Sequence, residues 1–190
     1  IGDRIVCATY LCAAAAAGGE VRLTGVDYRA VSTVALSLAE SGCEVRSEAD
    51  AVSLRSTGAL RSVRPVRTAP YPGFPTDAQP VLMAALLRSE GCTVFVENIF
   101  ENRYRHVDEL SRMGAEIRVV GRVAVVNGVR TLHGAAVKCT DLRGGAALVI
   151  AGLSAEGTTR VTELTHIDRG YDAIERDLAA LGAQIRRETT

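Results

Sequence analysis

Four short clusters of polar and charged residues stand just before segments with helical character. They are FPTD at 74–77, FENR at 100–103, TDLR at 140–143 and HIDRGY at 166–171. The amino end of a helix carries unpaired N–H groups and a partial positive charge, which favour anionic ligands. The clusters therefore predict a site for small anionic molecules, positioned by the starts of several helices.

Three arginines occupy corresponding places in these clusters, namely Arg103, Arg143 and Arg169. An arginine in the first turn of a helix opposes the helix dipole, so helix stability does not account for them. One interpretation is a structural ion pair between each arginine and a neighbouring aspartate. The other is a clamp for phosphate and carboxylate groups, because a guanidinium binds oxyanions through two hydrogen bonds. The repetition favours the clamp, although symmetry would also repeat an ion pair.

The aspartates near these arginines have a structural alternative to chemistry. An aspartate directly before a helix can cap it by accepting hydrogen bonds from the first free N–H groups, which contributes about 1 kcal/mol. We favour this N-cap interpretation for Asp3 and for Asp168, which precedes Tyr171. For Asp77 and Asp141 both interpretations stay open.

The clusters belong to a unit of about 70 residues that recurs three times. In each unit a very apolar segment ends in glycine, an alternating stretch follows, and a second helical segment stops at another glycine. The two glycines are 19 and 42 in the first unit, 91 and 114 in the second, and 157 and 182 in the third. We place the units at approximately 1–68, 69–132 and 133–190, within one domain that spans 1–190.

Two kinds of helix alternate within the units. The segments 10–17, 81–87 and 146–153 carry almost no charge, and a helix that is apolar on all sides is buried on all sides. The segments 107–113 and 171–181 have one polar and one apolar face. We therefore expect helices to form the buried core of the domain.

We expect each strand to have one solvent-exposed face and one buried face. Residues 116–119 and 184–186 alternate between polar and apolar, and the stretches 117–120 and 123–126 predict a hairpin that turns at Gly121. The fold class is therefore α+β, an inside-out domain of three pseudo-symmetric βαβαββ repeats with outward-facing sheets. The third repeat stops after 184–187, so it lacks part of its hairpin.

Composition limits the classes of function. Of the 190 residues, 47% are apolar, which is enough for one good core. The formal net charge is zero and aromatic residues make up 4%, which argues against nucleic acid as a partner. No apolar stretch is long enough to cross a bilayer, so we expect no membrane association. The chain opens on Ile1, which we read as the edge of an excised piece.

The sequence predicts no metal site. The five cysteines form no C-x-x-C pair, and His106, His133 and His166 are far apart in the chain. We expect the cysteines to be small buried thiols in a reducing cytosol.

Together the four clusters resemble those of the UDP-N-acetylglucosamine 1-carboxyvinyltransferases, the enolpyruvyl transferases that begin peptidoglycan synthesis. The resemblance runs over essentially the whole chain. Besides the four clusters it includes RTAP at 67–70, HV at 106–107 and ELSRMGA at 109–115.

The resemblance implies a cytoplasmic enzyme with two domains of the inside-out fold known from EPSP synthase. Such an enzyme moves the enolpyruvyl group of phosphoenolpyruvate to the 3'-hydroxyl of UDP-N-acetylglucosamine and releases phosphate through a tetrahedral intermediate, without a cofactor. The chain is similar to the carboxyl-terminal domain alone. Its implied partners are the two substrates and an amino-terminal domain, which carries a Lys-Asn pair and a loop with a reactive cysteine. By itself the chain is expected to be inactive.

The resemblance also implies catalytic roles for three residues. Asp77 matches the carboxylate that hydrogen-bonds the sugar 3'-hydroxyl and acts as its base. Asp141 matches a carboxylate near the cationic carbon that forms on protonation, where a fixed negative charge lowers the barrier. Arg169 matches an arginine beside phosphoenolpyruvate.

Three further residues match substrate-binding positions. Arg143 corresponds to a second arginine around phosphoenolpyruvate, and Arg103 to another at the cleft. Ile99 corresponds to a residue that contacts the nucleotide sugar mainly through its backbone. The chain departs from the family at Gly144 and Gly145, where Ala-Ser is usual, which removes a hydroxyl beside Arg143.

Two other functions remain open. The first is a domain of a 3-phosphoshikimate 1-carboxyvinyltransferase, which has the same fold, although the four clusters fit the nucleotide-sugar branch better. The second is a non-catalytic nucleic-acid or interaction module, because related repeats occur in RNA-processing proteins.

Overall fold

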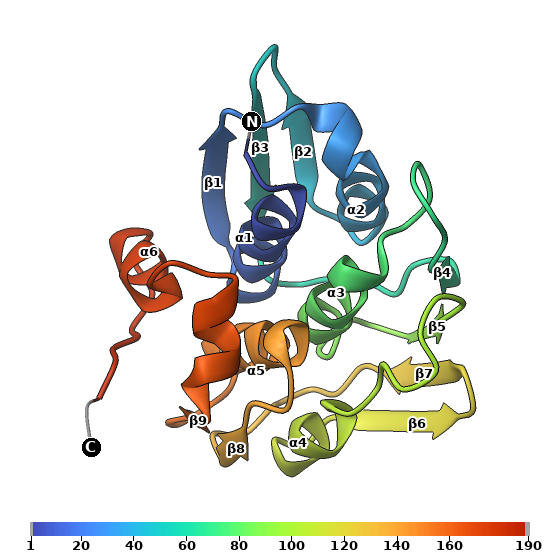
Figure 1. The fold of residues 1–190 in the computed structure, drawn as a ribbon, viewed down its shortest axis with the longest axis vertical. Coiled ribbons are helices and arrows are strands. Elements are labelled where there is room, and N and C mark those ends of the chain that lie inside the picture. Colours follow the sequence, from blue (N-terminus) through green and yellow to red (C-terminus); the bar gives the residue numbers. More distant parts are fainter. Residues whose placement is uncertain (1, 189–190) are drawn as a thin grey trace.

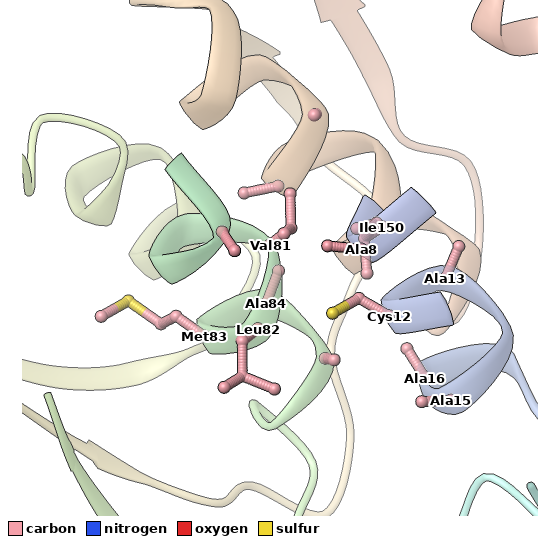
Figure 2. Close-up of a cluster of buried hydrophobic side chains, with 14 of the residues drawn as sticks. Ala8, Cys12, Ala13, Ala15, Ala16, Val81, Leu82, Met83, Ala84 and Ile150 are labelled. Atoms are coloured by element: carbon pink, nitrogen blue, oxygen red, sulfur yellow. The ribbon is translucent and has the colours of Figure 1, made fainter. Parts of the chain in front are cut away.

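Three buried helices form the centre of the molecule. The computed structural model describes residues 2–188. In it α1 (Arg4–Ala17), α3 (Gln79–Ala85) and α5 (Leu142–Leu153) pack against one another (Figure 1). Small side chains permit the close approach, since Ala8 and Ala84 are almost completely buried where the helices meet (Figure 2). The predicted burial of the three apolar segments is confirmed.

The first unit places an antiparallel sheet outside α1. Its strands are β1 (Gly19–Thr24), β2 (Glu44–Ser47) and β3 (Ala51–Ser56), in the order β1-β3-β2. Helix α2 (Tyr28–Glu40) joins β1 to β2 and packs on α1. Its buried residues Val31, Val34 and Leu38 recur at helical spacing, so one face of α2 meets the core while the other is exposed.

The second unit shows the complete predicted order of elements. A four-stranded sheet has the order β4-β5-β7-β6, in which β4 and β5 are parallel and the other pairs antiparallel. The elements that join α3 in this unit are β4 (Val66–Arg67), the 3-10 helix η1 (Thr76–Ala78), β5 (Cys92–Val96), α4 (Val107–Arg112), β6 (Glu116–Val120) and β7 (Val123–Asn127). The opening strand β4 lies just before the predicted boundary at residue 69, so the unit begins slightly earlier than expected. The hairpin predicted around Gly121 is confirmed, because Val120 pairs with Val123 across the turn.

The third unit differs most from the expectation. It contains β8 (Ala136–Lys138), α5, β9 (Arg160–Thr162), the 3-10 helix η2 (Leu164–Arg169) and α6 (Ile174–Ala180). Strands β8 and β9 form a two-stranded parallel sheet. The strand predicted at 184–186 is wrong: this segment runs away from α6 without joining a sheet (Figure 1). Alternation alone does not make a strand, since its N–H and C=O groups also need a partner strand.

Helix α6 also begins later than predicted. It starts at Ile174 instead of Tyr171, after Ala173, which has a left-handed backbone with φ of 54°. Among residues 2–188, the opening strand of the repeat is absent from the first unit and the closing hairpin from the third. Within the same residues no helix combines the length and apolarity needed to cross a bilayer.

The glycines that end the second helix of each unit have a common conformation. Gly42, Gly114 and Gly182 have φ values of 110°, 91° and 100°, in the left-handed region that side chains disfavour. Each follows shortly after α2, α4 or α6, where a left-handed residue reverses the chain and ends the helix. The repeated glycine spacing in the sequence therefore reflects a repeated helix end.

Gly145 packs where no side chain fits. A Cβ atom on this residue would overlap the Sγ atom of Cys139 and lie 2.6 Å from Cγ1 of Ile167. Residue 145 is buried in the first turns of α5, so η2 can approach this helix closely. Gly145 therefore sets the distance between α5 and the segment that carries Arg169.

We expect Gly145→Ala to destabilise the fold by about 1–3 kcal/mol, because overpacking a tight contact forces backbone or side chains to move. Urea denaturation followed by circular dichroism measures this change. Gly152→Ala is the matched control in the same helix, since its nearest contact to a new Cβ, Thr159 Cβ, lies at 3.2 Å. Equal stability of the two variants would contradict the packing argument.

Candidate active site

Asp77 lies between two arginines that come from other parts of the chain. Its Oδ1 accepts a hydrogen bond from Nη2 of Arg103 at 2.7 Å, and its Oδ2 accepts one from Nε of Arg143 at 3.3 Å. The arginine side chains are 14% and 12% exposed, while that of Asp77 is 40% exposed. The structure thus brings three of the four sequence clusters together around one carboxylate.

Each of the three residues is positioned by a different element. Asp77 lies in η1, directly before α3, and Arg143 lies in the first turn of α5. Arg103 precedes α4 by several residues and also donates to the carbonyl oxygen of Thr76 at 3.1 Å. Among the three arginines, only Arg143 occupies the first turn of a helix, which corrects the sequence interpretation for Arg103 and Arg169. The ion-pair interpretation holds for Arg103 and Arg143, with an aspartate distant in sequence.

Each of the two guanidinium groups lies over an aromatic ring. The guanidinium of Arg103 lies 5.6 Å from the ring centre of Phe100, and that of Arg143 lies 5.6 Å from the ring centre of Tyr171. Arg143 also donates from Nη1 to the hydroxyl of Tyr171 at 3.2 Å, and this hydroxyl is 2.8 Å from Oγ1 of Thr9 in α1. Contacts of this kind restrict the rotamers of long side chains and preorganise the site.

Asp141 is the N-cap of α5. Its Oδ1 accepts hydrogen bonds from the backbone N–H groups of Arg143 at 3.0 Å and Gly144 at 2.8 Å. Asp3 caps α1 in the same way, through Ile5 and Val6, so that interpretation is confirmed. The second oxygen, Oδ2, accepts a hydrogen bond from Oγ1 of Thr140 at 3.4 Å, so it is not used in the cap.

The N-cap interpretation of Asp168 is wrong. This residue lies inside η2, near its end, and its carboxylate accepts two hydrogen bonds from Arg187, at 2.6 and 3.1 Å. Arg187 also donates to Glu175, at 3.1 and 3.3 Å, so it joins η2 to α6. The pKa of Asp168 is lowered mainly by its hydrogen bonds from Arg187.

Arg169 follows Asp168 in the chain but takes no part in the ion pairs of Arg187 with Asp168 and Glu175. It is the exposed last residue of η2, and within residues 2–188 no carboxylate oxygen lies within 4.0 Å of its guanidinium. The backbone beside it packs on the start of α5, because a Cβ on Gly170 would lie 2.8 Å from Cδ2 of Leu142. Arg169 is therefore a cation near the start of α5 that is available to a ligand.

Arg103 and Asp141 line an open cleft of about 590 Å³. Ile99 and Phe100 form part of its wall, and Arg105 and Arg122 add two further cations that the sequence did not single out. Arg122 is anchored by a hydrogen bond from Nη1 to the carbonyl oxygen of Asn98 at 3.2 Å. Its position at the turn of the β6–β7 hairpin gives no sequence signal, because only the folded sheet brings that turn to the cleft.

Ile99 is 40% exposed, and its backbone N–H is already used. It donates to Oε1 of Glu97 at 2.8 Å. If Ile99 contacts a ligand through its backbone, the carbonyl oxygen is the atom that remains for it. The sequence did not single out Glu97, since it follows the apolar strand β5 without any motif of its own.

His106 lies behind the site and is completely buried. Neither ring nitrogen has a hydrogen-bond partner among residues 2–188. Burial lowers its pKa to about 4, against the opposing effect of the Asp141 charge. A Cβ on Gly144 would lie 2.9 Å from the Cβ of His106, so the missing side chain at 144 makes room for the imidazole.

Comparison with known proteins defines the family and the fold. Residues 1–178 match the family profile of EPSP synthase (3-phosphoshikimate 1-carboxyvinyltransferase). The enolpyruvyl transferase NikO from Streptomyces tendae matches 98% of the chain with a TM-score of 0.86 and 31% identity, over 44% of its own length. An EPSP synthase from Acinetobacter baumannii matches 98% of the chain over 44% of its own length, with a TM-score of 0.76, but at 22% identity it shows the fold alone. The fold is therefore the α+β domain of the enolpyruvyl transferases.

Relatives in sequence show to which family of enolpyruvyl transferases the chain belongs. The UDP-N-acetylglucosamine 1-carboxyvinyltransferase of Gluconacetobacter diazotrophicus is 51% identical over 97% of the chain and 44% of its own length. That of Desulfofundulus thermocisternus is 52% identical over 98% of the chain and 76% of its own length. The chain belongs to the UDP-N-acetylglucosamine 1-carboxyvinyltransferase family. It spans about half the length of the Gluconacetobacter relative.

The lowered pKa of His106 predicts a loss of stability in mild acid. Between pH 6.5 and about 4 the unfolded chain binds a proton at this histidine that the folded chain does not bind. The free energy of unfolding should therefore fall on the order of 3 kcal/mol as pH drops through that window.

Urea denaturation at pH 7 and pH 4.5 tests this expectation. His106→Leu should make the fall shallower, whereas His133→Gln, at an exposed histidine, should leave it unchanged. An unchanged pH dependence in the His106 variant would contradict the burial argument.

Proposed function

We propose that the chain is the carboxyl-terminal domain of an enzyme that transfers enolpyruvyl from phosphoenolpyruvate to the 3'-hydroxyl of UDP-N-acetylglucosamine. This is the first committed step of peptidoglycan synthesis. The observation that carries the proposal is the Asp77 carboxylate between Arg103 and Arg143, beside the cleft. Two relatives at 51% and 52% identity bear the name of this activity.

The proposed reaction adds the 3'-oxygen of the sugar to C2 of phosphoenolpyruvate while C3 takes up a proton. The tetrahedral intermediate then loses phosphate from C2 and a proton from C3, which restores the double bond. Asp77 accepts the proton of the 3'-hydroxyl, a role that suits a half-buried carboxylate at a helix start. Asp141 stabilises positive charge at C2 through its fixed carboxylate.

Arginines supply the opposite charge to the substrates. Arg143 and Arg169 bind the phosphate and carboxylate groups of phosphoenolpyruvate, and Arg103 contributes at the cleft. When the anionic groups of phosphoenolpyruvate bind the guanidinium of Arg143, the carboxylate of Asp77 loses one of its two arginine partners. It then becomes available to the sugar hydroxyl. Ile99 contacts the nucleotide sugar through its backbone.

The remaining features of the proposal concern the rest of the enzyme. We infer that an amino-terminal domain closes the cleft, that the three units are pseudo-symmetric copies, and that the enzyme acts in the cytoplasm. Residues 1–190 alone should then release no phosphate, because the other half of the substrate site is contributed by that domain. Residues 1–178 match the EPSP synthase profile. A 3-phosphoshikimate transferase is nevertheless disfavoured, because the relatives at 51% and 52% identity are UDP-N-acetylglucosamine 1-carboxyvinyltransferases.

A chimera tests the role of Asp77. Residues 1–190 replace the matching segment of the Gluconacetobacter relative, and phosphate release is measured with both substrates. Asp77→Asn should lower kcat about 10²–10⁴-fold, because an amide cannot accept the proton. Asp108→Asn, at an exposed carboxylate on α4, is the control. A kcat unchanged by Asp77→Asn would remove the base role.

The same chimera tests Arg169. Arg169→Lys should lower kcat/KM for phosphoenolpyruvate about tenfold or more, because an ammonium cannot reproduce the paired hydrogen bonds of a guanidinium. Arg176→Lys, on the exposed face of α6, keeps the same change of group away from the cleft. Equal kcat/KM values for the two variants would exclude a direct contact by Arg169.

A further inference from the structure

A buried carboxylate lies directly behind the candidate site. Glu97 follows β5 and is 1% exposed. Among residues 2–188, no arginine, lysine or histidine nitrogen lies within 4.0 Å of its oxygens. Four hydrogen bonds reach the carboxylate instead, from Thr68 Oγ1 at 2.9 Å, Thr76 Oγ1 at 3.0 Å, Ile99 N at 2.8 Å and Phe100 N at 3.1 Å.

The four donors come from three separate segments. Thr68 follows β4, Thr76 opens η1 immediately before Asp77, and Ile99 and Phe100 lie in the loop that leads to Arg103. Thr68 also accepts at Oγ1 from the backbone N–H of Asn98 at 2.8 Å, so it acts as both donor and acceptor in the network.

The two oxygens of Glu97 have different tasks. Oε2 accepts from Thr76 and so contacts the segment that carries Asp77. Oε1 accepts from Ile99, Phe100 and Thr68, and so fixes the loop that forms the cleft wall. A buried charge without a counterion is costly unless its hydrogen bonds are complete, so these segments are held to the carboxylate as a group.

We propose that Glu97 is a positioning residue that sets the distance between Asp77 and the nucleotide-sugar contact at Ile99. This inference rests on the proposed function, since it assigns Ile99 and Asp77 to one substrate. Glu97 does not touch the substrate. It fixes the position of the Asp77 carboxylate relative to the carbonyl oxygen of Ile99, because it accepts hydrogen bonds from both segments, from Thr76 and from Ile99.

Steady-state kinetics of the chimera test the proposal with variants that separate the hydrogen bonds from the charge. Glu97→Ala removes every acceptor and should raise KM for UDP-N-acetylglucosamine about tenfold or more, with a smaller change for phosphoenolpyruvate. Glu97→Gln keeps an acceptor for Ile99, Phe100 and Thr68, and its amide can donate to the Thr76 hydroxyl. It should retain most of the nucleotide-sugar affinity.

Two further variants complete the design. Thr76→Val removes only the contact nearest Asp77, so it should lower kcat and leave KM for the nucleotide sugar within about twofold. Glu109→Ala is the matched control for Glu97→Ala. Glu109 is a largely buried glutamate in α4 whose Oε2 accepts from the backbone N–H of Lys138 at 2.9 Å, and its variant should not change KM.

Hydrogen exchange on residues 1–190 measures the structural step independently of turnover. The amides of Ile99 and Phe100 should exchange about tenfold faster in Glu97→Ala than in the unmodified chain, and remain unchanged in Glu109→Ala. Circular dichroism identifies a variant that has unfolded. Should Glu97→Ala unfold, Glu97→Asp takes its place, because the shorter side chain withdraws both oxygens from their donors.

Several results would overturn the inference. They are an unchanged KM in Glu97→Ala with an active chimera, unchanged exchange at Ile99 and Phe100, or equal losses in Glu97→Gln and Glu97→Ala, which would indicate a role for the charge alone. An unmodified chimera without any transferase activity would instead overturn the proposed function, and the exchange rates would still show whether Glu97 fixes the loop.

Discussion

Charge neutralisation at Asp77 is the constraint on which the rest of the site depends. Arg103 and Arg143 are each less than 15% exposed, and two guanidinium groups at such close quarters repel each other unless an anion lies between them. The carboxylate of Asp77 provides this anion and brings η1, the loop before α4 and the start of α5 to one place.

Packing of the helices in the core positions the residues of the site. Helices α1, α3 and α5 approach closely because small residues face one another, and this brings the starts of α3 and α5 together. The hydroxyl of Tyr171 then joins Thr9 of α1 to Arg143 of α5. Gly144 and Gly145 let His106, Cys139 and Ile167 pack against α5. These two glycines therefore act through packing.

Sequence reasoning succeeded where the signal was local. The three apolar helices, the hairpin at Gly121 and the Asp3 cap each follow from a few adjacent residues and their spacing. It failed where a residue obtains its partner from a distant segment. Asp168 pairs with Arg187 instead of capping a helix, and 184–186 alternate without a partner strand. The buried carboxylate of Glu97 had no signal, because its four donors are distributed over three segments.

The sequence by itself indicated the α+β class through apolar periodicity and glycine positions, which are properties of short segments. The resemblance of its charged clusters to those of a known family indicated the family and the candidate residues. Only the tertiary structure decided which charges meet. It joined Asp77 to Arg103 and Arg143, left Arg169 without an ion pair among residues 2–188, and buried Glu97 and His106 behind the cleft. The physical reason is that hydrogen bonds and ion pairs require side chains within about 3–4 Å, a proximity that packing of the central helices creates.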